Sequence, residues 1–298
     1  TGGHIFPALA VAEAMKRHPK LFPPMYISLV NAGESGGMLD EVLWRIVAFG
    51  EQDEEIRGKA FSALIYPAFL LFMGAVAIFI LVSFVFPKFT QVFADFNATL
   101  PLLTRIVLGF CTFMGRLWWA VLLIVGFAAW SVVSFIRSES GRMKWDALTL
   151  KVPVLKRVVQ KYSMAQFARM LGTLLDNGVP VIDSIRITRD SMSNKAVAAQ
   201  LEHVLTRVAE GDSISAGLRQ AEHFPPMVVN MFATGEESGR LGSVTKRLAD
   251  AYDVEVDRAV KAMMALLEPI LIVVMGVFVG ILVIAMLWPM FTLSSNIT

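Results

Sequence analysis

Two carboxylates that directly follow glycines are the side chains in this sequence most suited to chemistry. Gly33-Glu34 and Gly235-Glu236 each place an acid at a glycine corner within a largely apolar stretch. Such a carboxylate can accept backbone N–H hydrogen bonds at a helix start, where donors lack partners and the helix dipole favours negative charge. It could alternatively bind a divalent cation or contact a partner protein. We favour the helix-start role.

The sequence around these acids does not supply a cation site. Asp40 follows Glu34 by six residues, but Gly242 stands at the matching place after Glu236. Hard cations usually take six or more oxygen ligands, which neither stretch provides. We therefore assign no metal site, and the sequence does not decide whether Glu34 or Glu236 binds a cation.

Other residues with chemical potential form no recognisable site. The four histidines, His4, His18, His203 and His223, have no metal-ligand spacing, and Cys111 is the only cysteine, so the chain cannot form an internal disulfide. The sequence contains no phosphate-binding P-loop and no nucleophile with a neighbouring base. We predict no catalytic residue, no cofactor and no enzyme activity, so that energy for any transport must come from a partner.

The first seven residues, Thr1-Gly2-Gly3-His4-Ile5-Phe6-Pro7, are glycine-rich and precede a helical stretch. A loop of this kind can bind a diphosphate when a strand precedes it and an α/β domain follows. The segment resembles the amino-terminal loop of the glycosyltransferase that completes the lipid-linked peptidoglycan precursor. The likeness ends by about residue 18 and the α/β context is missing, so a membrane glycosyltransferase is only a remote alternative.

The composition points to a membrane protein. Hydrophobic residues make up 55% of the 298 residues, charged residues 17%, and the mean hydropathy is +0.60. A bilayer core needs about 20 apolar residues of helix, and residues 64–86, 117–136 and 270–288 meet that length without a charge. We therefore expect three transmembrane helices.

The distribution of charge predicts the orientation of these spans. The net charge of +2 gives no case for binding nucleic acid, but residues 137–161 carry seven Lys and Arg against Glu139 and Asp146. The tail 289–298 has no charge, and only Lys88 and Arg105 lie between the first two spans before Arg116. By the positive-inside rule, the amino-terminal region and residues 137–264 are cytoplasmic.

An internal repeat organises the chain. With a shift of 202 positions (224 − 22), residues 22–89 align without a gap on residues 224–291. The matching residues include Phe22-Pro23-Pro24-Met25 on Phe224-Pro225-Pro226-Met227, Gly33-Glu34, Gly37 and Leu39 on Gly235-Glu236, Gly239 and Leu241, and Pro67 on Pro269. Each copy reads as a cytoplasmic helical module followed by a transmembrane helix, and the middle span is an unduplicated return crossing.

The fold class predicted is all-α, with a helical bundle present twice. Met164, Phe167, Met170, Leu171, Leu174 and Leu175 form one helical stripe, and Asn177-Gly178 ends that helix. Further helices are expected from about Val181, through Val197–Val208, after an N-cap at Ser213 and after the Pro225 corner, with a last helix from about Ser243. Pro67 and Pro269 are expected in the first turns of two spans.

The predicted boundaries follow from these elements. Residues 1–63 form a partial first module, 64–86 a span, 87–116 a short periplasmic loop, 117–136 a second span, 137–264 the second module with its bundle from about 163, and 265–298 the third span with a short tail. The first module lacks counterparts for about 163–204, so we expect the chain to begin inside the first repeat.

The pattern F-P-P-M, then G-E-x-x-G-x-L, then K-A and a proline-bearing apolar span resembles the duplicated domain of the type II secretion F protein family. The resemblance covers about residue 11 to the end. It implies an inner-membrane scaffold that contacts a cytoplasmic assembly ATPase, other inner-membrane components and pilin-like subunits. In this reading Phe22, Pro23, Gly33, Glu34, Gly37, Pro67, Phe224, Pro225, Gly235, Glu236, Gly239 and Pro269 are structural motif residues.

Two further expectations concern assembly. Gly276 and Gly280 form one G-x-x-x-G face, a pattern that lets transmembrane helices associate, so we expect a homo-oligomer in membrane lipid. The alternative function is a transporter or channel subunit, since repeated halves are also common there. Transporter repeats usually carry polar groups at the bilayer midplane, however, and these spans have none.

Overall fold

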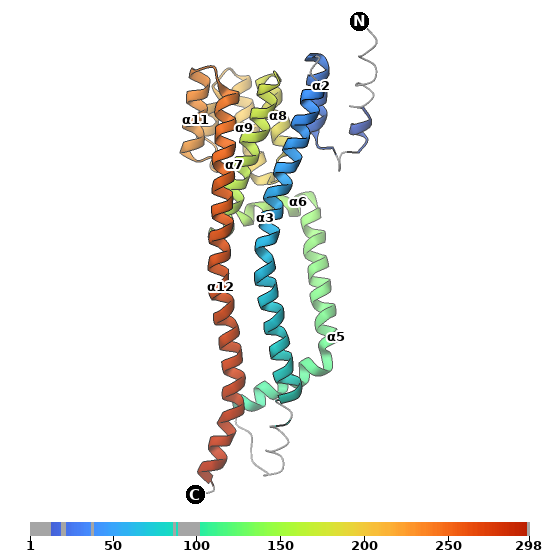
Figure 1. Ribbon diagram of the computed structural model, residues 1–298, viewed down its shortest axis with the longest axis vertical. Coiled ribbons are helices and arrows are strands. Elements are labelled where there is room, and N and C mark those ends of the chain that lie inside the picture. Colours follow the sequence, from blue (N-terminus) through green and yellow to red (C-terminus); the bar gives the residue numbers. More distant parts are fainter. Residues whose placement is uncertain (1–12, 19–21, 37–38, 86–87, 89–101, 297–298) are drawn as a thin grey trace. The chain divides into compact units, whose positions relative to one another are not determined.

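Every regular element in the described part of the chain is a helix (Figure 1). The computed structural model describes residues 13–18, 22–36, 39–85, 88 and 102–296. Its main helices are α2 (Pro24–Gly36), α3 (Leu39–Ile80), the π-helix η1 (Leu81–Val85), α5 (Leu102–Arg137), α6 (Glu139–Thr149), α7 (Pro153–Asp176), α8 (Val181–Ser191), α9 (Lys195–Ala209), α10 (Ile214–Arg219), α11 (Pro226–Glu237) and α12 (Leu241–Asn296). The all-α prediction is confirmed.

The chain divides into two compact units. Unit 1 consists of residues 1–60 and 138–261, and unit 2 consists of residues 61–137 and 262–298. Helices α3 and α12 each contribute residues to both units.

The helices of unit 1 begin and end at the residues that the sequence marked. The stripe of α7 is buried at Met164, Phe167, Met170, Leu171 and Leu174. The side chain of Ser213 accepts a hydrogen bond from the backbone N–H of Ala216 at 3.1 Å and so caps α10, which ends at Arg219. Gly178, with φ of 75°, takes the left-handed conformation after α7 that favours glycine.

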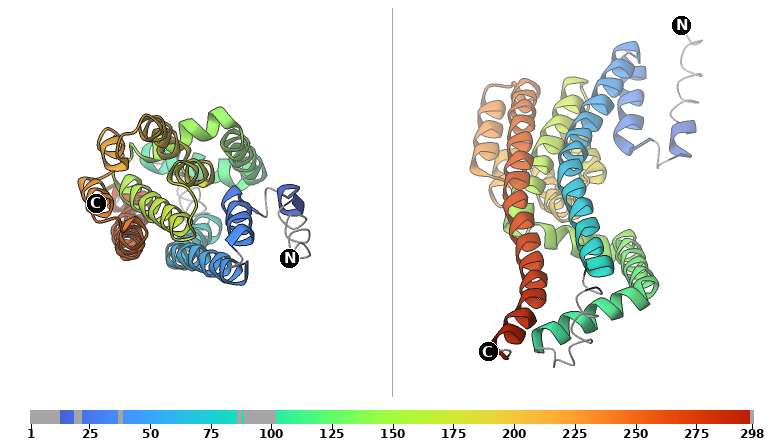
Figure 2. Two further views of the ribbon diagram at one scale, coloured as in Figure 1. Left: turned by 90° about the horizontal axis from the view of Figure 1, so that it is seen from above. Right: turned by 60° about the horizontal axis from the view of Figure 1, so that its bottom comes forward.

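Both copies of the repeat contribute to one core in unit 1. Met25 and Leu29 of α2 and Val42 of α3 pack with Met170 and Leu174 of α7, and all five are buried. The view from above in Figure 2 shows the helices of this unit gathered as a bundle. Helices of the first copy therefore complete the apolar packing of the second.

Unit 2 contains the ends of α3 and α12 together with α5. The hydroxyl of Thr104 in α5 donates to the carbonyl oxygen of Ala285 at 2.7 Å, and Val107 packs against Leu282 and Met286 of α12. The hydroxyl of Tyr66 donates to the carboxylate of Glu268 at 3.1 Å, and these two residues occupy equivalent positions of the repeat. The repeated helices thus meet one another at matching positions.

The helix that contains the second predicted span begins earlier in the sequence than expected. Residues 102–116, expected in a loop, belong to α5, which bends at Leu117, where φ is −117° and ψ is 19° (Figure 2). Val107 and Thr104 explain this, because their contacts with α12 give the stretch a helical face to pack. The remainder of the predicted loop, except Lys88, lies outside the described residues.

Two helical stretches are long and apolar enough to cross a membrane, judged by length and composition. They are Val42–Val85 and Leu241–Trp288, which include the first and third predicted spans. Gly126–Arg137 of α5 is a shorter apolar stretch within the second predicted span.

Candidate functional site

The glycine corners bring pairs of helices into close contact in both copies. A side chain at Gly33 would place its Cβ 2.7 Å from Cγ2 of Val42, and one at Gly235 would lie 3.3 Å from Cβ of Val244. Val42 and Val244 are themselves equivalent in the repeat. The glycines therefore allow α2 to approach α3, and α11 to approach α12, at the same point of each copy.

Glu236 lies in the last turn of α11, and its side chain reaches the start of α10. Its carboxylate accepts hydrogen bonds from the backbone N–H groups of Ile214 and Ser215, the latter at 3.1 Å, and from the Ser215 hydroxyl at 2.5 Å. These are first-turn donors of α10 that have no partner within the helix. This is the contact that the sequence favoured for such an acid.

The remaining motif residues at the corners are placed as follows. Glu34 lies in α2 with its Oε1 buried, and among the described residues that atom has no hydrogen-bond partner. Gly239, with φ of 65°, makes the turn between α11 and α12, whereas Gly37 lies outside the described residues. A Cβ at Gly242 would lie 1.7 Å from Oδ1 of Asp176, so the aspartate present at position 40 of the first copy would not fit here.

The Phe-Pro-Pro corner orients α11. Pro225 is extended, with φ of −63° and ψ of 150°, and Pro226 opens the helix. Phe224 is buried and its ring meets that of Phe167 edge-on, with centroids 5.1 Å apart. In the first copy, Phe22 and Pro23 are half-buried just before α2.

The helix-entry expectation for the two prolines is wrong. Pro67 lies in the interior of α3, which begins at Leu39, and Pro269 lies in the interior of α12, which begins at Leu241. The physical reason is that each helix runs from unit 1 into unit 2 without a new start, so that no first turn exists at either proline. Each proline leaves one carbonyl of the preceding turn without its N–H partner.

The junction between the two copies in unit 1 contains a largely buried polar cluster. The guanidinium of Arg169 in α7 pairs with the carboxylate of Asp253 in α12, and their side chains are only 10% and 19% exposed. The amide of Gln52 in α3 donates to the other carboxylate oxygen of Asp253 at 3.2 Å. Burial raises the pKa of Asp253, and the charge and hydrogen bond of Arg169 oppose that shift. The cluster therefore ties together three helices, one of them from the first copy.

A cavity of about 360 Å³ opens beside this cluster. It is lined by Arg45, Ala48, Phe49 and Gln52 of α3, Arg169, Gly172, Thr173 and Asp176 of α7, and Lys246, Ala249 and Asp250 of α12. Its charged groups are of both signs, and no nucleophile and base are paired in it. Such a lining is suited to helix packing or to binding a side chain of a partner protein, rather than to catalysis.

Ion pairs repeat outside the junction. Glu55 and Lys59 pair at 2.8 Å in α3, and their equivalents Asp257 and Lys261 pair at 2.7 Å in α12. Lys161 of α7 also reaches Glu255 of α12 at 2.6 Å. The hydrogen bond and charge of Lys161 lower the pKa of the Glu255 carboxyl.

Sequence analysis missed the Arg169–Asp253–Gln52 cluster. One signal was present, because Arg169 interrupts the apolar stripe of α7 between Phe167 and Met170, both of which are buried. A charge at the edge of a buried stripe indicates a partner on a neighbouring helix. The sequence did not show which carboxylate that partner would be.

Comparison with known proteins identifies relatives of two kinds. The type IV pilus assembly protein PilC of Myxococcus xanthus is 35% identical over 286 residues, which are 96% of this chain and 69% of the relative. PilC of Thermus thermophilus is 35% identical over 292 residues, 97% of this chain and 71% of the relative. The type II secretion system protein F of Xanthomonas campestris pv. campestris is 33% identical over 288 residues, 96% and 71%.

A family model matches the same repeated architecture. The matched residues are 8–87 and 167–289, which include the corner, the glycine-acid motif and the long apolar helix of each copy. Residues 1–7, the basis of the glycosyltransferase alternative, fall outside the match and outside the described residues. The chain belongs to the family of type II secretion system (T2SS) protein F.

Proposed function

We propose that this chain is the inner-membrane platform subunit of a type II secretion or type IV pilus machine, and that it links a cytoplasmic assembly ATPase to the assembly of pilin-like subunits. The observation that carries the proposal is the family match of both copies, each with its long apolar helix. Relatives named for each of the two machines align with nearly the whole chain.

A three-span topology is supported by the two chain segments that make up unit 1. Residues 1–60 and 138–261 fold together in that unit and must share one compartment. The intervening chain therefore crosses the bilayer an even number of times. If α3 crosses once, α5 must cross back, and α12 then supplies the third span. The basic residues of 137–161 put unit 1 in the cytoplasm.

The protein acts as a scaffold without a catalytic step. Two of the groups suited to chemistry are engaged in contacts within the fold: Glu236 caps α10, and Arg169 pairs with Asp253. The energy for assembly therefore comes from the ATPase. The platform couples the ATPase to the filament by binding to both.

The exposed face of α12 in unit 1 is our candidate for the ATPase contact. Arg247, Asp250, Val254 and Arg258 are all exposed and are spaced three or four residues apart, which places them on one face. The corresponding stretch of the first copy, residues 45–56, is also rich in charge. Exposed charged residues of this kind raise the rate of association with a partner more than they raise the affinity.

Site-directed photocrosslinking tests the proposal. A photoreactive phenylalanine at Arg247 or Arg258 should yield a joint band with the assembly ATPase when both are produced in bacterial inner membranes. The band should vanish when the ATPase is omitted. The same group at Ile182 of α8, which is 37% exposed, reports on non-specific capture.

Two negative results together would overturn the proposal. If the chain is inserted, folded and produced with the ATPase, and neither α12 position crosslinks above the Ile182 background, then α12 is not the ATPase contact. If the chain also fails to support filament assembly in a host whose own platform gene is deleted, the platform function is rejected.

A further inference from the structure

The segment that follows α5 carries an unusual surplus of positive charge. Arg137, Arg142, Lys144, Lys151, Lys156 and Arg157 stand against two acids, Glu139 and Asp146. Asp146 is already engaged, since its carboxylate accepts the backbone N–H of Lys195 at 2.7 Å. The one acid of the segment whose side chain is described therefore binds a backbone N–H and forms no ion pair with these cations.

One side of α6 is fixed to the rest of unit 1. The guanidinium of Arg142 donates to the carbonyl oxygen of Ser193 at 3.2 Å, and Asp146 holds the first residue of α9. Gly141 and Leu150 are buried. These contacts determine which face of α6 points outward.

The outward face combines cations with large apolar side chains. Lys144, Leu148 and Lys151 lie three or four residues apart, and Trp145 beside them is 39% and Leu148 51% exposed. From Lys151 to Arg157 every residue is exposed, including Val152, Val154 and Leu155. Apolar side chains and cations thus share one continuous surface, which we name the α6–α7 surface (Lys144, Trp145, Leu148 and residues 151–157).

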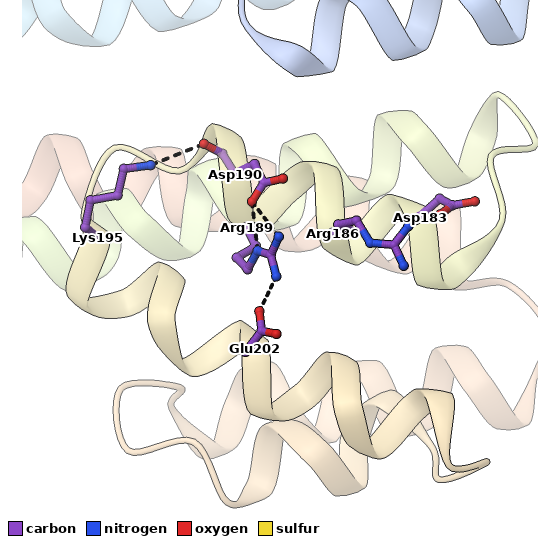
Figure 3. Close-up of polar contacts among 6 residues, drawn as sticks. All are labelled: Asp183, Arg186, Arg189, Asp190, Lys195 and Glu202. Carbon is purple, nitrogen blue, oxygen red and sulfur yellow. Dashed lines mark hydrogen bonds and ion pairs between the residues drawn. The ribbon is translucent and has the colours of Figure 1, made fainter. Parts of the chain in front are cut away.

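The cations of this surface differ from those on α8 and α9. Figure 3 shows Arg189 paired with Asp190 and Glu202, and Arg186 bonds Asp183 at 2.7 Å. By contrast, Lys144, Lys151, Lys156 and Arg157 make no ion pair or hydrogen bond through their side chains with any described residue. The charged face of α8 and α9 carries its own carboxylates, and the α6–α7 surface does not.

We propose that the α6–α7 surface docks on the anionic headgroups of the bilayer that holds the apolar helices, with Trp145 and Leu148 inserted at the interface. The inference rests on the membrane location in the proposed function. Helix α5 ends at Arg137 and α6 begins at Glu139, so the chain passes directly from an apolar helix to this surface. Amphipathic segments with Lys, Trp and Leu bind at the headgroup boundary, and basic clusters beside a span attract anionic lipid.

The test uses the full chain with Cys111 replaced by Ser, reconstituted in lipid nanodiscs. Leu148→Cys carries an environment-sensitive fluorophore, and nitroxide-labelled phosphatidylglycerol or phosphatidylcholine serves as quencher. Ile182→Cys is the matched control, because it is also apolar and part-exposed in unit 1. Ile182 lies just beyond the far end of α7, whose 24 residues span about 36 Å.

We expect the Leu148 label to be quenched by nitroxide lipid and the Ile182 label to be unaffected. Quenching by the anionic lipid should exceed that by the zwitterionic lipid by about twofold or more, given the attraction of each basic residue to an anionic leaflet. Lys144→Gln with Lys151→Gln and Lys156→Gln should bring this ratio to about one. Unit 1 should keep its thermal unfolding temperature, because these lysines form no ion pair or side-chain hydrogen bond with the residues that the structure describes.

Two failures are distinguishable. If the chain does not enter nanodiscs at all, the membrane location of the proposed function fails. If it enters with unit 1 folded, and the Leu148 label is as insensitive to nitroxide lipid as the Ile182 label, then only the docking of the α6–α7 surface is overturned.

Discussion

Arg169 and Asp253 form the most buried ion pair among the described residues of unit 1, and removal of one partner should be costly. Arg169→Met leaves the Asp253 carboxylate largely buried with only Gln52 as a donor, so we expect a loss of about 2–3 kcal/mol in the free energy of unfolding. Urea titration of the purified protein measures it. Adding Asp253→Asn should restore part of the loss, and independent effects of the two changes would contradict the pairing.

Glu236 caps α10, and the adjacent Glu237 provides a matched control for removing that cap. Glu236→Ala removes the acceptor for the first N–H groups of α10, which should cost about 1–2 kcal/mol, the usual value of a helix cap. Glu237→Ala removes an exposed acid that makes no side-chain hydrogen bond or ion pair with a described residue, and should change stability by less than about 0.5 kcal/mol. Equal effects in the two variants would show that capping by Glu236 does not stabilise the fold.

Glu255 predicts a dependence of stability on pH. Lys161 lowers the pKa of this carboxyl in the folded state, so the folded protein binds its proton less readily than the unfolded chain does. The stabilisation is therefore present above the unfolded pKa and is lost as pH falls through the folded pKa, below about pH 4. Glu255→Gln should lower the unfolding temperature at pH 7 and have little effect near pH 3.

Glu54 is the control for that comparison, since it is exposed on α3 and makes no ion pair with a described residue. Glu54→Gln should leave the unfolding temperature unchanged at both pH values. A Glu255→Gln difference that persists at pH 3 would mean that the ion pair with Lys161 is not its cause.

Among the helices, α3 and α12 give equivalent residues unequal surroundings. A Cβ at Gly74 would lie 1.9 Å from the Met275 terminal methyl group and 2.9 Å from its sulfur, whereas Gly276, its equivalent, has nothing within 4 Å. We expect Gly74→Leu to lower the unfolding temperature, because the added side chain must displace Met275 from the contact between α3 and α12. Gly276→Leu should leave that temperature unchanged.

The open glycines of α12 lead to a separate expectation about self-association. Gly276 and Gly280 have no neighbour within 4 Å, so their face is free for a second copy. Gly276→Ile with Gly280→Ile should weaken self-association in a membrane two-hybrid assay, with Gly74→Leu as the comparison. Unchanged association would remove this face from the oligomer contact.

Local signals in the sequence predicted where helices lie better than they predicted which helices pack together. The stripe of α7, the Ser213 cap and the Pro225 corner each depend on residues within a few positions, and all three lie where expected. The helical start of α5 was missed because Thr104 and Val107 are held by α12, about 180 residues away in sequence. The partner of Arg169 was missed for the same reason, since the interruption of the α7 stripe did not indicate which distant carboxylate Arg169 would meet.

At the scale of the whole molecule, the glycine-acid corners were predicted as structural and the cavity beside Arg169 was not foreseen. The repeat made it possible to expect related helices in both copies. It did not indicate that Met25 and Leu29 of the first copy would share a core with α7 of the second. That packing depends on the volumes and shapes of the side chains where the two copies meet. An alignment of one copy on the other contains no information about contacts between them.

The shared core of unit 1 leads to a prediction about the path of the whole chain through the membrane. In a Cys111→Ser background, single cysteines at Glu54, Lys88 and Glu202 report on the first copy, the stretch before α5 and the second copy. Three spans with unit 1 in the cytoplasm predict that a membrane-impermeant maleimide labels Lys88→Cys in spheroplasts, and labels Glu54→Cys and Glu202→Cys only after lysis. Labelling of Glu202→Cys together with Lys88→Cys would mean that α5 does not cross. That result would place the two copies in different compartments, and it would contradict both the three-span topology and the common core of Met25, Leu29, Met170 and Leu174.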